Sequence, residues 1–290
     1  MESEGINSES LKEIGRLSEL GFEGWTQDSN GIFTSDKNST ISEDISFPES
    51  AYEHEFVNLD SFWVYCRAKM IHRAIESHNV KLIWEIGAGS GSVAIPISKE
   101  GISVIATEPY YSGVQNIAKS KVTVFHASLK DLNIPNDSIN AVGIFDVLEH
   151  IENPRDFLHQ IWNFLASNGY IFVTVPAHQW LFSDFDTSIG HFRRYSLANL
   201  DKELLESGFQ KVERRYFFSL LVLPAFILRR IPYLFGRRRS FEGKKGTRLS
   251  SNRLFRPTNA INEILKKLLL AESRLRLPFG LSVIGVYRKA

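Results

Sequence analysis

The fold is decided by the stretch Glu85-Ile86-Gly87-Ala88-Gly89-Ser90-Gly91, which joins an apolar run to a helical pattern. The run before it, KLIWEI at 81–86, predicts a buried strand, and residues 92–100 predict a helix with apolar positions on one face. Glycines let the backbone turn sharply and let a ligand approach without interference from a Cβ atom. A helix that starts after such a turn also offers free N–H groups to a carboxylate. The stretch therefore predicts a ligand-binding turn at the end of a strand.

The same alternation of strand and helix continues along the chain and predicts an α/β fold. Seven strands are predicted, at residues 81–86, 102–107, 122–126, 138–145, 170–175, 211–217 and 281–287. Six helices are predicted, at residues 60–78, 92–100, 114–120, 154–165, 197–207 and 260–271. Because helices of this size separate the strands, the connections should be right-handed crossovers. We expect a mainly parallel seven-stranded sheet with helices on both faces.

Composition and charge divide the chain into four parts. Residues 1–50 are predicted to be a loosely ordered acidic leader, since residues 1–60 hold 14 acidic and three basic side chains. The core is assigned to 51–217, an apolar and then basic insertion to 218–257, and a final helix and strand that complete the sheet to 258–290. A single cysteine, Cys66, excludes an internal disulfide and fits a reducing cytoplasm. The N-terminus has no apolar core, so no signal peptide is expected.

An acidic residue, Glu108, ends the second predicted strand, 17 residues after Gly91. A carboxylate at this point can accept both hydroxyls of a ribose, whether the ligand is a nicotinamide dinucleotide or another nucleoside. The turn has the spacing G-x-G-x-G, preceded by Glu85, and not the G-x-G-x-x-G of dinucleotide sites. This variant favours the methyl donor S-adenosylmethionine. A nucleotide-binding oxidoreductase remains the alternative, although no Tyr-x-x-x-Lys pair is found in the cofactor half.

A third motif makes the pattern specific. Phe145 is followed by DVLEHIENP at 146–154, which resembles the motif after the fourth strand in class I S-adenosylmethionine-dependent methyltransferases of the ubiquinone-type or type 11 branch. Phe62-Trp63 with Arg67 resembles the F-W-x-x-x-R helix of one bacterial group within that branch. The strings S-x-x-D at 183–186 and G-H-F-R-R-Y at 190–195 resemble a second signature of that group, and P-F-G-L-S at 278–282 a third. The resemblance covers residues 60–290.

The resemblance implies a Rossmann-like class I fold, S-adenosylmethionine as cofactor, and a small-molecule, saccharide or lipid-linked methyl acceptor. The implied cofactor-binding residues are Glu85, Gly87, Ala88, Gly89, Gly91, Glu108, Pro109, Ser128, Leu129, Phe145 and Asp146. One residue departs from the family pattern: Ser128 stands where an acid usually holds the adenine amino group. Either Asp131 substitutes for that acid or adenine binding is weaker, and Leu129 still offers its backbone N–H. Ser128 is also the feature that favours a non-catalytic scaffold.

Two histidines are the candidate general bases, because neutral imidazole titrates near working pH. His150 follows the fourth strand, and the alternative is that it orders the loop there. His191 lies in a polar segment after the fifth strand, and the alternative is a structural pairing with Asp184 or Asp186. The candidate acceptor-binding residues are Trp63, Arg67, Trp180, Asp186, Arg193, Arg194 and Tyr195. The arginines could instead pair with the aspartates, and the aromatic residues could belong to the core. No metal site is expected, because the histidines lack ligand spacing.

Positive charge concentrates near the end of the chain, where residues 229–256 contain ten bases and one acid. An apolar stretch containing Pro224 precedes it, so residues 217–256 predict contact with a membrane surface. The alternative is an apolar cover over the acceptor site followed by a solvated loop. No nucleic-acid partner is expected, since aromatic residues do not alternate with the bases at stacking positions. We expect a cytoplasmic location, and the alternative is peripheral attachment to the inner membrane surface.

Overall fold

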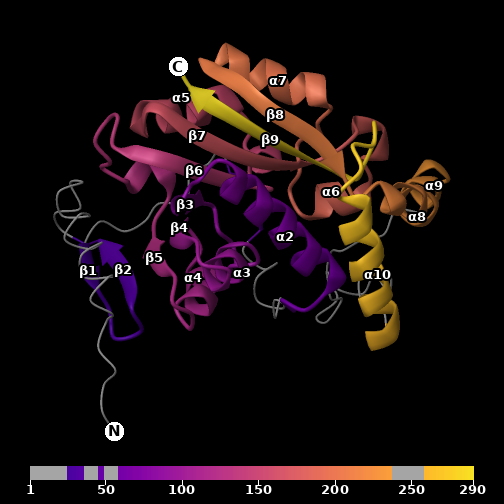
Figure 1. Cartoon of the computed structure of the whole chain (residues 1–290), viewed down its shortest axis with the longest axis horizontal. Coiled ribbons are helices and arrows are strands. Elements are labelled where there is room, and N and C mark those ends of the chain that lie inside the picture. Colours follow the sequence, from indigo (N-terminus) through magenta and orange to yellow (C-terminus); the bar gives the residue numbers. More distant parts are fainter. Residues whose placement is uncertain (1–24, 36–44, 49–57, 237–257) are drawn as a thin grey trace, which may run out of the picture.

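The computed structural model describes residues 25–35, 45–48, 58–236 and 258–290, and it centres on one twisted sheet (Figure 1). The sheet has nine strands in the order β1-β2-β5-β4-β3-β6-β7-β9-β8. All seven predicted strands are present, and their bounds differ by a few residues from those expected. The fold class is confirmed: this is a Rossmann-like α/β sheet with helices on both faces.

The chain reverses direction across the sheet at its central strand, β3 (Leu82–Ile86). From β3 the chain moves outward through β4 (Ser103–Glu108) to β5 (Thr123–His126), all parallel. It then crosses back to β6 (Ile139–Phe145), which pairs with the other side of β3. In open α/β sheets, ligands bind outside the carboxyl ends of the strands at such a reversal. The topology therefore places the candidate site at the ends of β3, β4 and β6.

The other side of the sheet ends in antiparallel strands. β7 (Leu165–Pro176) is parallel to β6, but β9 (Ser282–Lys289) is inserted between β7 and β8 (Phe209–Phe217) and runs antiparallel to both. The final residues of the chain thus complete the interior of the sheet. The sequence analysis predicted these three strands, but not the antiparallel insertion of the last one between the other two.

Two strands near the N-terminus were not predicted. β1 (Trp25–Gln27) and β2 (Ile32–Ser35) form a hairpin, and β2 pairs in parallel with β5. The ring of Phe33 stacks on that of Phe125, with centroids 4.8 Å apart. Residues 25–35 were expected in a loosely ordered leader, so this part of the prediction is wrong, as is the count of seven strands. The two strands, of three and four residues, are too short to show a clear alternation. The rest of the segment 1–44 lies outside the described residues.

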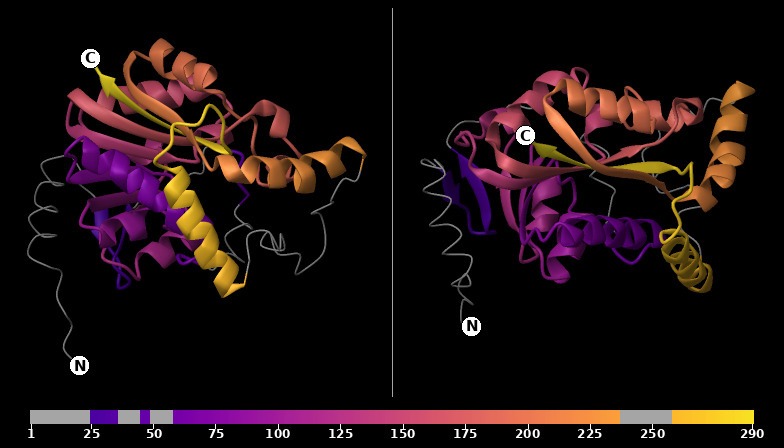
Figure 2. Two further views of the ribbon diagram at one scale, coloured as in Figure 1. Left: turned by 45° about the vertical axis from the view of Figure 1, so that its right-hand side comes forward. Right: turned by 45° about the horizontal axis from the view of Figure 1, so that its top comes forward.

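Helices cover both faces of the sheet (Figure 2). One layer contains α2 (Phe62–Ser77), α3 (Ala94–Lys99), α4 (Tyr111–Ile117) and α10 (Asn259–Glu272), whose buried residues share a core cluster. The opposite layer contains α5 (Pro154–Phe164) and α7 (Leu197–Glu206), which pack into a second cluster. The sheet separates the two apolar cores, as expected for a three-layer α/β domain.

The segment after β8 projects from the sheet edge as short helices. They are α8 (Val222–Ala225), a π-helical turn (Phe226–Arg230) and α9 (Ile231–Leu234). Among the described residues, no helix is long and apolar enough to span a bilayer. The basic stretch 237–257 lies outside the described residues.

We predict that Phe33→Ala lowers the free energy of unfolding by about 3 kcal/mol, because it removes a buried ring from the stack on Phe125. Urea unfolding followed by circular dichroism measures the change. Val212→Ala, at an exposed position of β8, is the control and should shift it by less than about 0.5 kcal/mol. Equal effects of the two substitutions would show that the hairpin does not pack on the sheet in solution.

Candidate functional site

The glycine turn after β3 lies over the end of β4. The backbone N–H groups of Gly87 and Ala88 donate to the carbonyl oxygen of Thr107 at 2.9 and 3.0 Å. Gly87, Gly89 and Gly91 have φ values of +71°, +58° and +83°. A Cβ atom on Gly87 would lie 2.8 Å from the side chain of Val147. The turn therefore needs glycine both for its backbone conformation and for its approach to the segment after β6.

Glu108, the last residue of β4, is held against this turn. Its carboxylate accepts hydrogen bonds from the backbone N–H of Gly89 at 2.8 Å and from that of Tyr110 at 3.0 Å. Gly113 in α4 allows the close packing, because a Cβ atom there would lie 2.9 Å from Glu108 Cγ. The carboxylate is therefore fixed at the edge of the cleft.

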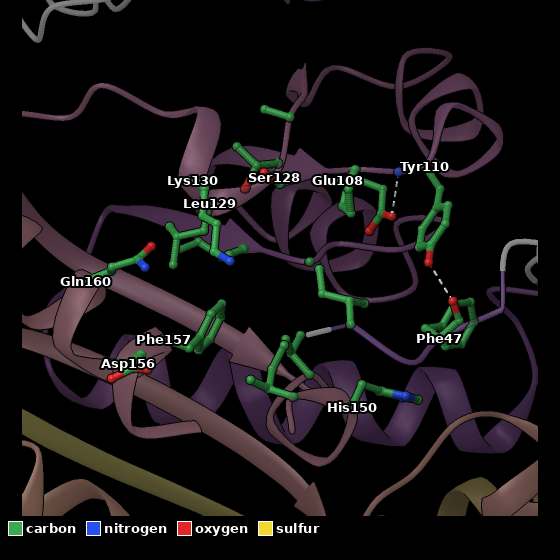
Figure 3. Close-up of a pocket in the computed structure, with 18 of the residues that line it drawn as sticks. Phe47, Glu108, Tyr110, Ser128, Leu129, Lys130, His150, Asp156, Phe157 and Gln160 are labelled. Atoms are coloured by element: carbon green, nitrogen blue, oxygen red, sulfur yellow. Dashed lines mark hydrogen bonds between the residues drawn. The ribbon is translucent and has the colours of Figure 1, made fainter. Parts of the chain in front are cut away.

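A cavity of about 400 Å³ opens beside Glu108, at the carboxyl ends of the parallel strands (Figure 3). Its volume lies within the range typical of small-ligand sites. Six of the predicted site residues line it: Gly87, Glu108, Pro109, Ser128, Leu129 and His150. Six other predicted cofactor residues do not line it: Glu85, Ala88, Gly89, Gly91, Phe145 and Asp146.

The sequence analysis missed part of the cavity wall. Ile45 and Phe47 come from the N-terminal region, while Phe157 and Gln160 come from α5. The Tyr110 hydroxyl donates to the Phe47 carbonyl oxygen at 2.5 Å and ties residues 45–48 to the cavity (Figure 3). No motif in the acidic leader indicated this role. The position of Phe157 one turn inside a helix that begins at the sheet edge was the available signal for α5.

Ser128 makes a local structure with Asp131. The Asp131 carboxylate accepts the Ser128 backbone N–H at 2.9 Å and the Ser128 hydroxyl at 2.7 Å, which caps a short 3₁₀ turn. Ser128 lines the cavity and Asp131 does not. The acid is thus engaged with Ser128 and does not take its place on the cavity wall.

Below the turn lies a group of buried charges. Arg67 of α2 forms an ion pair with Asp146 at 2.9 Å and donates to the Ser92 hydroxyl at 3.3 Å. Burial raises the pKa of Glu85 to about 8, against the lowering effect of Arg67. Thr174 donates to Asp146 at 3.0 Å and fixes that carboxylate. Arg67 does not line the cavity and acts here as the counterion of Asp146.

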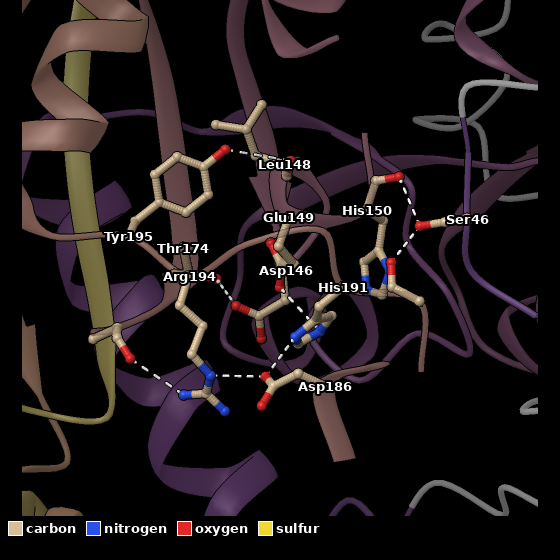
Figure 4. Close-up of polar contacts among 12 residues, drawn as sticks. Ser46, Asp146, Leu148, Glu149, His150, Thr174, Asp186, His191, Arg194 and Tyr195 are labelled. Atoms are coloured by element: carbon tan, nitrogen blue, oxygen red, sulfur yellow. Dashed lines mark hydrogen bonds and ion pairs between the residues drawn. The ribbon is translucent and has the colours of Figure 1, made fainter. Parts of the chain in front are cut away.

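The G-H-F-R-R-Y segment forms an ion-pair network around Asp186 (Figure 4). Asp186 accepts from His191 Nδ1 at 2.9 Å and from Arg194 Nε at 2.7 Å. Burial opposes ionisation, but the bond from His191 and the charge of Arg194 lower the pKa of Asp186 to about 2. Arg194 thus pairs with Asp186, as in the alternative that has these residues bind each other and not the acceptor. Tyr195 is buried, and its hydroxyl donates to the Leu148 carbonyl oxygen at 3.4 Å.

The remaining predicted acceptor residues lie apart from this network. Arg193 donates to the Glu152 carbonyl oxygen at 2.8 Å and is half-buried. Trp63 packs on Phe218 with ring centroids 4.7 Å apart, and Trp180 is half exposed. None of these residues lines the cavity described above.

His150 and Glu149 follow β6 in a 3₁₀ turn, Leu148–His150. His150 lines the cavity, and its Nδ1 donates to the Gly190 carbonyl oxygen at 3.2 Å. Burial and the neighbouring His191 lower the pKa of His150 to about 3, so its ring is neutral. Glu149 is completely buried, and burial together with Asp146 raises its pKa well above the usual range.

Comparison with known proteins agrees with this geometry. The family model described as "Methyltransferase domain" matches residues 67–214, which is half of the chain. The chain belongs to this methyltransferase-domain family. The matched range includes Arg67, the glycine turn, Glu108 and the DVLEH motif, while residues 45–48 of the cavity wall lie outside it.

This chain matches its curated relatives over only part of their length, about half in the first of them. A probable S-adenosylmethionine-dependent methyltransferase of Mycobacterium tuberculosis is 24% identical over 160 residues, covering 54% of this chain and 58% of that protein. A mitochondrial ubiquinone biosynthesis O-methyltransferase of Schizosaccharomyces pombe is 26% identical over 98 residues, covering 31% and 35% of the two chains. A solved S-adenosylmethionine-dependent methyltransferase of Archaeoglobus fulgidus is 19% identical with a TM-score of 0.48, covering 77% of this chain and 94% of that one.

We predict that Glu85→Gln changes how the stability of the methyltransferase domain depends on pH. Glu85 ionises near pH 4.5 when unfolded and near pH 8 when folded, so the folded state holds the extra proton between these values. Stability should therefore fall as the pH rises through this window, and glutamine should remove that loss. Relative to wild type, the variant should gain about 2 to 4 kcal/mol between pH 5 and pH 8 in urea unfolding. Glu206→Gln, at an exposed position, is the control. Parallel stability curves for wild type and Glu85→Gln would contradict the assignment.

Proposed function

We propose that the chain binds S-adenosylmethionine in the cavity beside Glu108 and transfers its methyl group to a bound acceptor. One observation carries the proposal. The glycine turn after β3, the fixed carboxylate of Glu108 and a cavity of about 400 Å³ lie together where the strand order of the sheet reverses. Family membership supports it, as does the similarity to probable S-adenosylmethionine-dependent methyltransferases.

The residues of the cavity fit the chemistry of this ligand. Glu108 would accept the ribose hydroxyls, Ser128 and Leu129 would meet the adenine edge, and the apolar side chain of Phe157 would cover a ring face. The turn 87–91 would take the amino-acid end of the ligand, because its glycines permit close backbone approach. Asp146, with Arg67 as its counterion, would lie near the ammonium group.

The ligand would supply an activated methyl group that needs no further leaving-group assistance. The acceptor lone pair forms the new bond to the methyl carbon, while the carbon–sulfur bond breaks and its electron pair stays on sulfur. The protein mainly positions the acceptor in line with that bond. An acceptor hydroxyl or amine would lose its proton to a base, and His150 and His191 are the proposed candidates. His150 lines the cavity, while His191, whose ring is aligned by Asp186, lies behind it with a ring-centroid distance of 4.7 Å.

The acceptor is proposed to be a small molecule, a saccharide or a lipid-linked compound that reacts through oxygen or nitrogen. The name of the ubiquinone biosynthesis O-methyltransferase among the relatives supports an oxygen acceptor. Mass spectrometry of lipid and glycan extracts from cells with and without the gene would find the acceptor as a mass difference of one methylene group.

We predict that Glu108→Gln lowers the affinity for S-adenosylmethionine by about 10- to 100-fold. The substitution removes the negative charge and replaces one carboxylate oxygen, which would accept from a ribose hydroxyl, with an NH₂ group that can only donate. Isothermal titration calorimetry on the full chain measures the effect. The matched control is Glu100→Gln, since Glu100 is exposed, pairs with Lys69 and lies outside the cavity.

Titration with a nicotinamide dinucleotide separates this proposal from the oxidoreductase alternative. Tight binding of the dinucleotide by the wild-type protein, or of neither ligand, would reject the proposed function.

A second proposed property is contact of residues 217–256 with a membrane surface. Large apolar side chains are exposed along the described part of this segment, and they include Leu220, Leu223, Ile227, Leu228, Leu234 and Phe235. Two arginines in the same segment fold back on the protein: Arg229 stacks over Phe185, and Arg230 donates to the Phe182 carbonyl oxygen. Charge that attracts anionic lipid would therefore come mainly from the bases at 237–256, outside the described residues.

We predict that the double substitution Leu223→Asp and Phe235→Asp reduces binding to anionic phospholipid vesicles by at least about 10-fold. These side chains are 65% and 81% exposed, and burial of each in lipid would contribute about 1.5 to 3 kcal/mol. Flotation on a density gradient measures the bound fraction. Leu205→Asp on α7, also exposed, is the control. Failure of the wild-type protein to float with vesicles would reject membrane contact while leaving the proposed activity intact.

A further inference from the structure

Three side chains with metal-ligand chemistry meet beside the cavity. Glu149 and His150 follow β6, while His191 follows α6 (Asp184–Ser188), about 40 residues later in the sequence. One ligand atom from each of the three residues lies within 4.8 Å of the other two. The imidazole rings of His150 and His191 have centroids 4.7 Å apart and are nearly perpendicular. The sequence analysis predicted no metal site, because the histidines are not spaced along the chain as metal ligands are. The fold nevertheless brings these three side chains together.

Glu149 is the unusual member of this cluster. Its side chain is completely buried, and neither carboxylate oxygen has a hydrogen-bond partner among the described residues. The Nε2 atom of His191 lies 3.8 Å from Glu149 Oε1, beyond hydrogen-bonding distance. The nearby guanidinium groups have carboxylate partners already, because Arg67 pairs with Asp146 and Arg194 with Asp186. An ionised carboxylate in this position needs a charged or hydrogen-bonding partner, and a bound cation would supply one.

The two histidines are arranged as metal ligands usually are. The Nδ1 atom of His191 contacts Asp186 at 2.9 Å, and that of His150 contacts the Gly190 carbonyl oxygen at 3.2 Å. A carboxylate and a carbonyl can only accept, so each Nδ1 carries the proton and each Nε2 keeps its lone pair. Second-shell acceptors of this kind fix the tautomer and orientation of ligating histidines.

We propose that Glu149, His150 and His191 bind one divalent transition-metal ion. Two imidazoles and one carboxylate suit Zn²⁺, Co²⁺ or Fe²⁺ better than Ca²⁺ or Mg²⁺, which prefer oxygen ligands. Ligand atoms that share one metal at about 2.0 to 2.2 Å lie about 3 to 3.5 Å apart. His191 Nε2 and Glu149 Oε1 lie 3.8 Å apart, and all three ligand atoms lie within 4.8 Å of one another, so metal binding needs a closing movement of at most about 1.8 Å.

Three protein ligands leave at least one coordination position open, as in catalytic metal sites. His150 also lines the cavity, so the ion would lie at the cavity wall. An acceptor hydroxyl bound there would lose its proton more readily, since a metal lowers the pKa of a coordinated oxygen. With the ion bound, the Nε2 lone pairs of His150 and His191 would be on the metal, so the ion would replace the two histidines as the group that activates the acceptor. That role rests on the proposed function, whereas metal binding itself does not.

The test uses the full chain, treated with chelator and then titrated with Zn²⁺ by isothermal titration calorimetry. The wild-type protein should bind one equivalent and gain thermal stability. Glu149→Gln keeps the side-chain shape and should weaken binding by at least about 100-fold and abolish the thermal shift. His159→Gln, which removes an exposed histidine of α5, should bind as wild type does.

A second, independent variant guards against misfolding. If Glu149→Gln is unfolded by circular dichroism, His150→Gln takes its place with the same expected loss. Absence of stoichiometric Zn²⁺ binding by the wild-type protein would overturn the proposal, as would unchanged binding in a folded variant. Binding of S-adenosylmethionine by the chelator-treated protein is measured separately, so failure of the metal site leaves the proposed function standing.

Discussion

The backbone hydrogen bonds between the glycine turn and the end of β4 are the constraint on which the site depends. Gly87 and Ala88 donate to Thr107, and Gly89 donates to Glu108, so two neighbouring strand ends are fastened together. This fastening holds the turn against the carboxylate at the edge of the cavity. Without these hydrogen bonds, the crevice at the reversal of strand order would have no carboxylate held in a defined position.

Much of this arrangement could be predicted from local patterns. The turn and Glu108 could be predicted because each follows a buried strand directly, and a parallel sheet brings such ends to one edge. The start of α5 could be predicted as well, because Pro154 stands in its first turn, where proline is favoured. The order of β8 and β9 could not be predicted from periodicity, since nothing local says that the final strand enters between two earlier ones.

The parts that escaped prediction depend on contacts far apart in sequence. The hairpin of β1 and β2 is too short to be recognised alone, and it is stabilised by packing Phe33 on Phe125. Phe47 reaches the cavity through Tyr110, 63 residues away. The cluster of Glu149, His150 and His191 likewise forms only because two separate loops meet in the fold. Metal-ligand motifs are recognised in a sequence by the spacing of residues within one segment, so this cluster gave no signal.

Residues 45–48, of which Ile45 and Phe47 line the cavity, contact the loops that carry the histidine cluster. The Ser46 backbone N–H donates to the His150 carbonyl oxygen at 3.2 Å, and the Ser46 hydroxyl donates to the Gly190 carbonyl oxygen (Figure 4), which also accepts from the His150 ring. A Cβ atom on Gly190 would lie 2.1 Å from the Ser46 carbonyl oxygen, so only glycine permits this approach. The Gly190 carbonyl oxygen therefore joins residues 45–48 of the cavity wall to the ring of His150, because it accepts from both.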